Sequence, residues 1–286
     1  MNSEIIGLTN WLQTSPGEYL LAWESAQFDQ AVTDIFGFHA LQMGLPELDT
    51  LRANRIPHRW LAEPLIPLSK SKPDSVPLTT EQSRTSFSPL SSRPRAALIT
   101  DSCALPFPQN SLDLVVLPHT LELSRDPHAT LREVERVLVP DGRVVISGFN
   151  PVSLWGIRQQ RALVYQRFGY NNLFLPEVGD FIGYWRLRDW LRLLSFEVES
   201  ARFGCYRPAL ASQKWLARFD WMDKAGGRWW PIFGAVYFLV AVKRVRGMRL
   251  LDLGWKSHKP VAVAPVVVAN KAPAKESATS NFPFSP

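Results

Sequence analysis

Two polar residues, Asp101 and His119, each follow an apolar run of the sequence. Asp101 comes directly after AALIT at 96–100, and His119 comes directly after LDLVVLP at 112–118. Such short apolar runs are typical of buried strands, so both residues are predicted at the open ends of neighbouring strands. A carboxylate there can accept hydrogen bonds from a ligand, and an imidazole can act as a general base. The pair therefore predicts one cleft, bordered by both groups.

The elements that position this pair alternate between strand and helix. An amphipathic helix is predicted at 127–138, between the strand at 112–118 and a further apolar strand at 143–149. Continuous apolar strands joined by helices are typical of a parallel sheet that is covered on both faces. We predict an α/β fold, a Rossmann-like doubly wound sheet that is mostly parallel, with a terminal antiparallel strand and helices on both faces.

Further strands and helices are predicted on either side of this unit. The predicted strands are 38–47, 58–63, 196–204 and 234–244. Helices are predicted over 4–36, with a break at Ser15-Pro16-Gly17 and an end at Gly37, and over 156–168 and 186–195. The apolar stretch 229–242 is too short to cross a bilayer and contains Pro231, so it predicts a buried strand with its lead-in.

The segment from Asp101 to Ser147 resembles class I S-adenosylmethionine-dependent methyltransferases, specifically the type 11 group. It contains D-x-x-x-LPF-x-x-x-S-x-D-x-V, then a turn around HTLE, and then DPHATLREVERVLVPDGRVVIS. The resemblance implies S-adenosylmethionine as cofactor and in-line transfer of its methyl group. Such transfer requires positioning and a dry site more than acid–base catalysis.

The resemblance also implies a nucleoside site. It assigns Asp101 to the adenine amino group, with the backbone of Ser102 and Cys103 beside the ring, and it places Pro118 and His119 near the methionine or ribose end. The alternative for Asp101 is a loop residue that caps a turn. His119 can equally be structural, and its role as general base is the weakest of these assignments.

The first loop of the resemblance departs from the family pattern. The family has an acidic residue and two or three glycines, whereas this chain has LQMGLPEL, with Gln42 near the acidic position and Gly44 as the remaining glycine. We expect Leu45 and Pro46 to narrow the methionine pocket, because glycines there let backbone amides approach a ligand closely. Glu63 is the candidate for the ribose diol, or alternatively an exposed strand exit.

This departure keeps a second functional class open. A catalytically silent methyltransferase fold, acting as a binding or regulatory partner, predicts a filled pocket behind Leu45 and Pro46 and dependence on a protein partner. If the chain is an enzyme, the eleven tryptophans favour an apolar or aromatic small-molecule acceptor, although most such side chains pack in cores. His119, His39 and Tyr184 are the candidate proton acceptors for a hydroxyl substrate.

A third class rests on charge. The net charge of +6 and a pI near 9.5 would suit nucleic acid or an anionic membrane surface. WRLRDWLRLL at 185–194 is basic and amphipathic, but we expect Trp185, Leu191 and Leu194 to pack on the sheet. The basic residues are scattered, which favours an ordinary solvated surface.

Composition narrows the remaining choices. The two cysteines form no CxxC pair, so neither a disulfide framework nor a metal site is expected. The start of the sequence lacks a basic segment followed by an apolar run, and a cytoplasmic protein is therefore expected.

The domain organisation follows from these patterns. We expect an N-terminal helical extension at 1–36, a methyltransferase-like domain at 37–246 and a low-complexity tail at 247–286. Within the domain, a Pro/Ser-rich insertion is expected at 64–95 and a lid or substrate region at 151–232.

Overall fold

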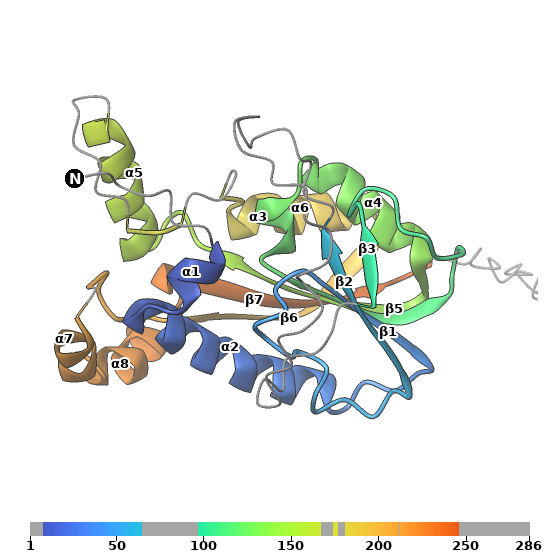
Figure 1. The fold of residues 1–286 in the computed structure, drawn as a ribbon, viewed down its shortest axis with the longest axis horizontal. Coiled ribbons are helices and arrows are strands. Elements are labelled where there is room, and N and C mark those ends of the chain that lie inside the picture. Colours follow the sequence, from blue (N-terminus) through green and yellow to red (C-terminus); the bar gives the residue numbers. More distant parts are fainter. Residues whose placement is uncertain (1–7, 65–96, 167–173, 177–180, 211, 246–286) are drawn as a thin grey trace, which may run out of the picture. The chain divides into compact units, whose positions relative to one another are not determined.

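The computed structural model describes residues 8–64, 97–166, 174–176, 181–210 and 212–245. Seven strands form one sheet in the order β3-β2-β1-β4-β5-β7-β6 (Figure 1). They are β1 (His39–Met43), β2 (His58–Pro64), β3 (Leu98–Thr100), β4 (Leu112–Pro118), β5 (Leu138–Phe149), β6 (Phe196–Gly204) and β7 (Val236–Lys243). Only the pairings of β7 within this sheet are antiparallel. The predicted fold class is confirmed.

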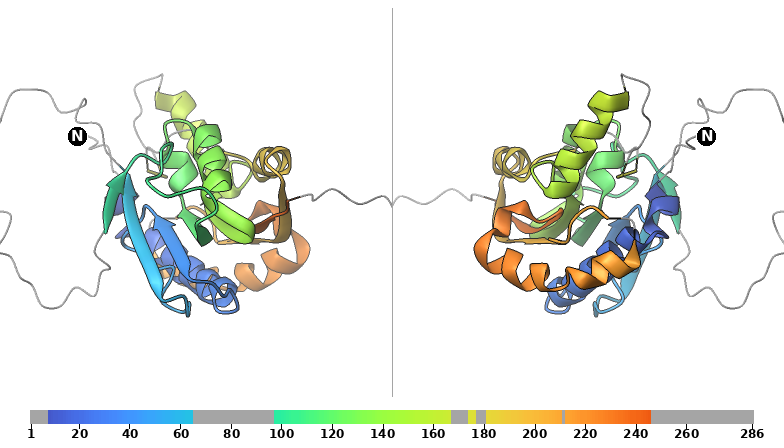
Figure 2. Two further views of the ribbon diagram at one scale, coloured as in Figure 1. Left: turned by 90° about the vertical axis from the view of Figure 1, so that its right-hand side faces the viewer. Right: turned by 90° about the vertical axis from the view of Figure 1, so that its left-hand side faces the viewer.

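Helices cover both faces of the sheet. They are α1 (Leu8–Leu12), α2 (Ser15–Val32), α3 (Thr120–Leu123), α4 (Pro127–Val137), α5 (Leu154–Gln166), α6 (Tyr184–Leu193), α7 (Gln213–Arg218), α8 (Trp221–Trp229) and the 3-10 helix η2 (Pro231–Phe233). Figures 1 and 2 show α2 on one face of the sheet and α4 and α6 on the other. No helix of the described ranges is long and apolar enough to cross a membrane.

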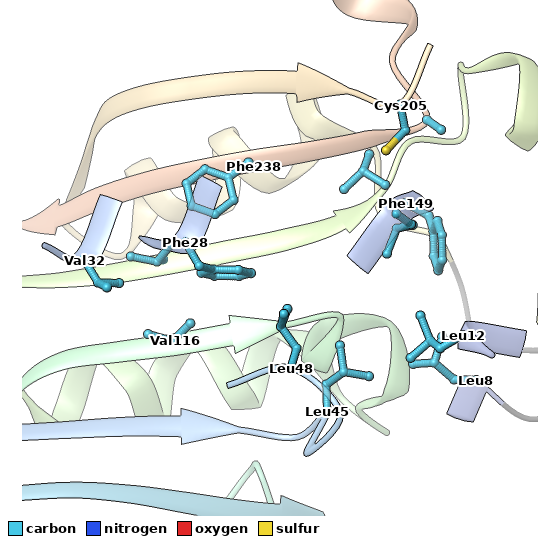
Figure 3. Packing of buried hydrophobic residues seen from close by; sticks show 14 of the residues in the cluster. Leu8, Leu12, Phe28, Val32, Leu45, Leu48, Val116, Phe149, Cys205 and Phe238 are labelled. Atoms are coloured by element: carbon cyan, nitrogen blue, oxygen red, sulfur yellow. The ribbon is translucent and has the colours of Figure 1, made fainter. Parts of the chain in front are cut away.

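Each face of the sheet carries its own apolar core. On the first face, Phe28 and Val32 of α2 are fully buried beside Val116 and Phe238 (Figure 3). The rings of Phe28 and Phe238 meet edge to face, with centroids 4.9 Å apart. Burying one such side chain stabilises a fold by roughly 1.5–3 kcal/mol. Because α2 supplies part of this core, the N-terminal helices belong to the same packed unit as the sheet.

Prolines in the sequence start helices here rather than break them. The predicted interruption of the helical region is present but lies earlier, since α1 ends at Leu12 and α2 begins at Ser15, and the second helix ends at Val32 rather than Gly37. Thr14 precedes the helix, and its hydroxyl accepts the N–H of Gly17. Proline is well accommodated in a first helical turn because the N–H that it lacks would have no helical partner.

The segment that follows α4 also differs from the prediction. The turn Pro140-Asp141-Gly142 lies inside β5, which begins at Leu138 and is therefore longer than predicted. The register between β4 and β5 shifts between Leu112 and Leu114, and Asp141 has a φ of 64°. The turn residues thus form an irregularity within the strand pairing.

The region before β7 contains helices that the sequence pattern did not predict. α7, α8 and η2 occupy 213–233, whereas β7 itself is buried along its whole length, as predicted. In α6, Leu191 is buried, but the expectation that Trp185 packs on the sheet is wrong, because 56% of its surface is exposed. The predicted insertion and tail lie outside the described residues, apart from Pro64 at the end of β2.

Candidate functional site

A cavity of about 260 Å³ lies at the carboxyl ends of four parallel strands. Its lining includes Gly44 after β1, Glu63 of β2, Asp101 and Ser102 after β3, and Thr120 after β4. The strand order reverses between β1 and β4, because β2 and β3 lie on one side and β5 on the other. Ligands of open α/β sheets bind at such a switch point. The structure therefore brings together four of the residues predicted for the cofactor: Gly44, Glu63, Asp101 and Ser102.

Gly44 opens the loop after β1 in a conformation that favours glycine. Its φ is +73°, and its N–H donates to the carbonyl of Ala62 at 2.7 Å, which ties the loop to the end of β2. A Cβ at this position would meet the Thr120 hydroxyl at 3.5 Å, an ordinary contact. The backbone conformation, rather than lack of space, is what a side chain would strain.

We expect Gly44→Ala to lower the free energy of unfolding by about 1–2 kcal/mol, because an L-residue in the left-handed region carries that cost. Chemical denaturation of the purified variant measures this change. Gly227→Ala is the matched control, since nothing lies within 4 Å of its added Cβ. The control removes a glycine from α8 and should raise stability by about 0.5–1 kcal/mol. Equal effects at both positions would contradict the conformational role of Gly44.

The buried side chain of Gln42 fixes the loop after β1 through hydrogen bonds. Its side-chain amide donates to the carbonyls of Leu45 at 3.1 Å and Leu48 at 2.6 Å, with a longer contact of 3.3 Å to Gly44. The amide oxygen accepts the N–H and hydroxyl of Thr50 at 3.0 and 2.7 Å. Only 2% of the residue is exposed. Gln42 stands near the position where the methyltransferase family has an acidic residue, and its side chain here forms hydrogen bonds within the loop.

The loop's bulky residue points away from the cavity. Leu45 has a φ of 48° and is 5% exposed, and it packs in the core with Leu8, Leu12 and Leu48 (Figure 3). Neither Leu45 nor Pro46 is among the residues that line the described cavity. The expectation that they narrow the pocket is corrected, because the left-handed backbone turns Leu45 into the core.

The cavity is flanked by charged groups. Asp101 is exposed, and its Oδ1 accepts the N–H of Cys103 at 3.0 Å, so it does cap a turn. Within the described part of the chain, its other oxygen and the Glu63 carboxylate have no hydrogen-bond partner. Arg125, which sequence reasoning missed, also lines the cavity and is exposed. Two carboxylates and a guanidinium suit a ligand that carries hydroxyl or amino donors and a carboxylate.

A cluster of small polar side chains supports the loop after β3. The hydroxyl of Ser124 lies 3.1 Å from that of Ser102 and 2.7 Å from that of Thr130. The half-buried Cys103 thiol faces the Thr130 hydroxyl at 3.7 Å and does not line the cavity. Thr120, also missed from the sequence, donates from its hydroxyl to the carbonyl of Met43 at 2.5 Å. These contacts fix the relative positions of the loops after β1, β3 and β4.

His119 is buried between two carboxylates. Its Nδ1 lies 2.9 Å from Glu122 Oε2, and its Nε2 lies 3.0 Å from Glu24 Oε1 of α2, although the second pair is not aligned as a hydrogen bond. None of its surface is exposed, and neither Pro118 nor His119 lines the cavity. The expectation that His119 borders the cleft with Asp101 is corrected, because both ring nitrogens face buried glutamates.

The charge of this cluster follows from its contacts. Burial alone would lower the pKa of His119, but Glu24 and Glu122 outweigh it and raise that pKa to about 10. Burial raises the pKa of Glu122 above its usual value, against the opposing effects of His119 and the Phe149 N–H. The raised pKa favours the imidazolium form of His119 at neutral pH, which holds a proton rather than accepting one.

The other two candidate bases also lie away from the cavity. His39 begins β1, so it lies at the opposite end of the strand from Gly44, and its ring stacks on His58 with centroids 5.3 Å apart. Tyr184 packs against Phe203 and Trp185. The described residues contain no group of three side chains that could hold a metal ion.

Comparison with known proteins agrees with this architecture. Residues 77–146 match the family model described as a methyltransferase domain. A chain of the solved complex between the Haloferax volcanii Trm112 methyltransferase activator and a methyltransferase-like partner has a TM-score of 0.51 and 15% sequence identity. The match covers 85% of this chain and 99% of that chain. Together with the strand order, these findings confirm a class I methyltransferase fold, and S-adenosylmethionine is the cofactor of that class.

Two curated relatives extend the comparison. The chain is 34% identical over 165 residues to YafS of Escherichia coli strain K12, which is described as uncharacterized, and the match covers 56% of this chain. It is 38% identical over 66 residues to the malonyl-[acyl-carrier protein] O-methyltransferase of Halorhodospira halophila, covering 23% of this chain. These matches span 60% of the first relative and 22% of the second.

Proposed function

We propose that this chain binds S-adenosylmethionine in the cavity and transfers its methyl group to a small molecule. The observation that carries the proposal is the open cavity at the switch point, where Glu63, Asp101 and the Gly44 backbone converge. A silent scaffold would instead have a filled pocket behind Leu45, and this residue packs in the core. The cytoplasmic setting expected from the sequence remains part of the proposal.

The lining residues fit the parts of this cofactor. The two oxygens of Glu63 suit a ribose diol, and the unpartnered oxygen of Asp101 suits an adenine amino group. Arg125 suits the cofactor's carboxylate, and Gly44 leaves the backbone accessible. When bound, the cofactor supplies an electrophilic methyl group on a sulfonium ion. The chain's own contribution is then to position the reactants and to exclude water.

The acceptor is proposed to be an apolar or aromatic small molecule. The region after β5 supports this class, because α5, α8 and η2 present apolar and aromatic side chains on the same edge of the sheet as the cavity. None of the three candidate bases lines the cavity. This arrangement suits an acceptor that needs no proton removed by the protein in the transfer step.

Calorimetric titration with S-adenosylhomocysteine and S-adenosylmethionine tests the site. We expect saturable binding to the wild-type chain and a loss of about tenfold or more in affinity for Asp101→Asn and for Glu63→Gln, because each replaces a charged acceptor. Asp101→Asn keeps a side-chain oxygen for the Cys103 N–H, so it spares the turn. Glu18→Gln, at an exposed site on α2, is the control that should bind as wild type.

Two outcomes would overturn parts of this proposal. No binding to the wild-type chain at millimolar ligand would refute the methyltransferase function and favour the silent scaffold. Unchanged affinity in both site variants would show that the cofactor binds elsewhere.

A further inference from the structure

An exposed aromatic surface lies mainly on the segment between β6 and β7. It consists of Leu154 at the start of α5, Trp221 and Trp229 of α8, Trp230, and Phe233 of η2, and we call it the tryptophan surface. Each of these five side chains is between 47% and 72% exposed. Soluble domains rarely leave so many large apolar side chains together in water, and such patches mark interaction sites.

The tryptophan surface contains a hollow of about 270 Å³. Leu154, Trp221, Trp230 and Phe233 line it together with Tyr206, and no charged side chain is among its lining residues. The Tyr206 hydroxyl is occupied within the fold, since it donates to the carbonyl of Pro231 at 2.9 Å. The hollow is therefore an apolar recess that offers a ligand almost no hydrogen-bonding specificity.

Four exposed basic residues lie on α8, which lines the recess, and on α7, which precedes it in the chain. Lys214 and Arg218 of α7 and Lys224 and Arg228 of α8 are all exposed, and none forms an ion pair with a residue that the structure describes. The segment between β6 and β7 has two acidic residues, Asp220 and Asp223, which both pair with one further basic residue. Arg207 pairs with Asp223 at 2.9 Å and also with Asp220. The surface therefore presents an excess of positive charge around exposed tryptophans.

The fold places this surface at the edge of the sheet that holds the candidate cofactor site. Val236 at the start of β7 pairs with Phe149 at the end of β5, so η2 lies at the carboxyl end of the parallel strands. Asn150, which follows β5, fixes the chain between η2 and β7. Its side-chain amide donates to the carbonyls of Ile232 at 2.7 Å and Gly234 at 2.9 Å. In Figure 1, α8 lies on the α2 side of the sheet, whereas α6 covers the other side.

We propose that the tryptophan surface docks this chain on an anionic lipid bilayer. Tryptophan side chains prefer the interface between headgroups and acyl chains, and lysine or arginine beside them attracts anionic lipid. The cores of protein interfaces are depleted of lysine, whereas here α8 carries Trp221 and Trp229 together with the exposed Lys224 and Arg228. The proposal does not depend on the cofactor, so it can fail or hold independently of methyl transfer.

Co-sedimentation with lipid vesicles tests the proposal on the full chain. We expect binding to phosphatidylcholine vesicles that contain phosphatidylglycerol, at least about tenfold weaker binding to pure phosphatidylcholine, and weaker binding at high salt. The double variants Trp229→Ala/Trp230→Ala and Lys224→Gln/Arg228→Gln should each reduce binding about tenfold or more. Trp185→Ala is the matched control: this exposed tryptophan lies beside Arg188 on α6 and should bind as wild type.

Circular dichroism and thermal melting of each variant establish that the fold is kept, because the substituted side chains are mostly exposed. Absence of wild-type binding to anionic vesicles would overturn the proposal. A loss of binding in Trp185→Ala as strong as in the tryptophan-surface variants would overturn it equally. Sedimentation that shows a dimer without vesicle binding, lost in Trp229→Ala/Trp230→Ala, would assign the surface to a second copy of the chain instead.

Discussion

Replacing His119 with asparagine is expected to lower the free energy of unfolding by about 3–5 kcal/mol, because it leaves two buried carboxylates without their shared cation. Glu24 and Glu122 both have no more than 2% of their surface exposed. Asparagine is the suitable replacement because His119 has a φ of 52°, a conformation that asparagine tolerates well. The His119→Asn variant therefore removes the positive charge without adding backbone strain. Urea denaturation near neutral pH measures the change.

The same cluster predicts how stability depends on pH. The folded-state pKa of His119 is raised to about 10, above the ordinary value of 6.5, so its stabilising effect is complete below pH 6.5 and is lost as pH rises toward 10. Between pH 7 and 9, we expect the wild-type free energy of unfolding to fall by about 1 kcal/mol per pH unit from this group. The raised pKa of Glu122 acts in the same direction as pH rises above its ordinary value of 4.5, because the unfolded carboxyl ionises first. His119→Asn should lack the slope between pH 7 and 9.

Two further variants of α2 make this prediction specific. Glu24→Gln leaves His119 paired with Glu122, so we expect a smaller loss than for His119→Asn. Glu18→Gln changes an exposed carboxyl of the same helix and should leave stability within about 0.5 kcal/mol. An equal pH slope in wild type and His119→Asn would show that His119 is neutral in the folded chain. In that case the cluster would be a hydrogen-bonded group rather than an ion pair.

The sequence pattern predicted the sheet better than it predicted the surroundings of the sheet. Apolar runs such as LDLVVLP correspond to β4 residue for residue, because a buried strand requires apolar side chains on both faces. Short helices such as α7 and α8 carry no comparable signal. In the sequence, their exposed tryptophans cannot be distinguished from core residues, and only the fold shows that they face solvent.

The lining of the candidate cavity was predictable where a residue's place along a strand decides its position. Glu63 lies near the end of β2 and Asp101 follows β3, and parallel strands bring their carboxyl ends to one edge. His119 follows a strand in the same way, yet its left-handed backbone and the approach of α2 bury its ring. Contact between Glu24 and His119 joins residues far apart in the chain, and no local pattern reports it.

Gln42→Glu is expected to lower the free energy of unfolding by about 3–5 kcal/mol, because it places a carboxylate where carbonyl oxygens converge. The amide of Gln42 donates to the carbonyls of Leu45 and Leu48, and a glutamate has no N–H to replace it. The variant restores the acidic residue of the family pattern, so a family-based expectation would be a neutral or stabilising effect. Urea denaturation of Gln42→Glu and of the exposed-site control Gln13→Glu distinguishes the two.

The reason for the expected loss lies in how this loop is built. A glycine-rich loop can bring its own amides toward a ligand, whereas here one glycine remains and a buried side-chain amide fixes the loop carbonyls instead. Thr50→Val tests the other half of the network, since it removes the hydroxyl that donates to Gln42 and should cost about 1 kcal/mol. If Gln42→Glu is as stable as wild type, the loop does not depend on the amide, and its shape must come from the packing of Leu45 and Leu48 alone.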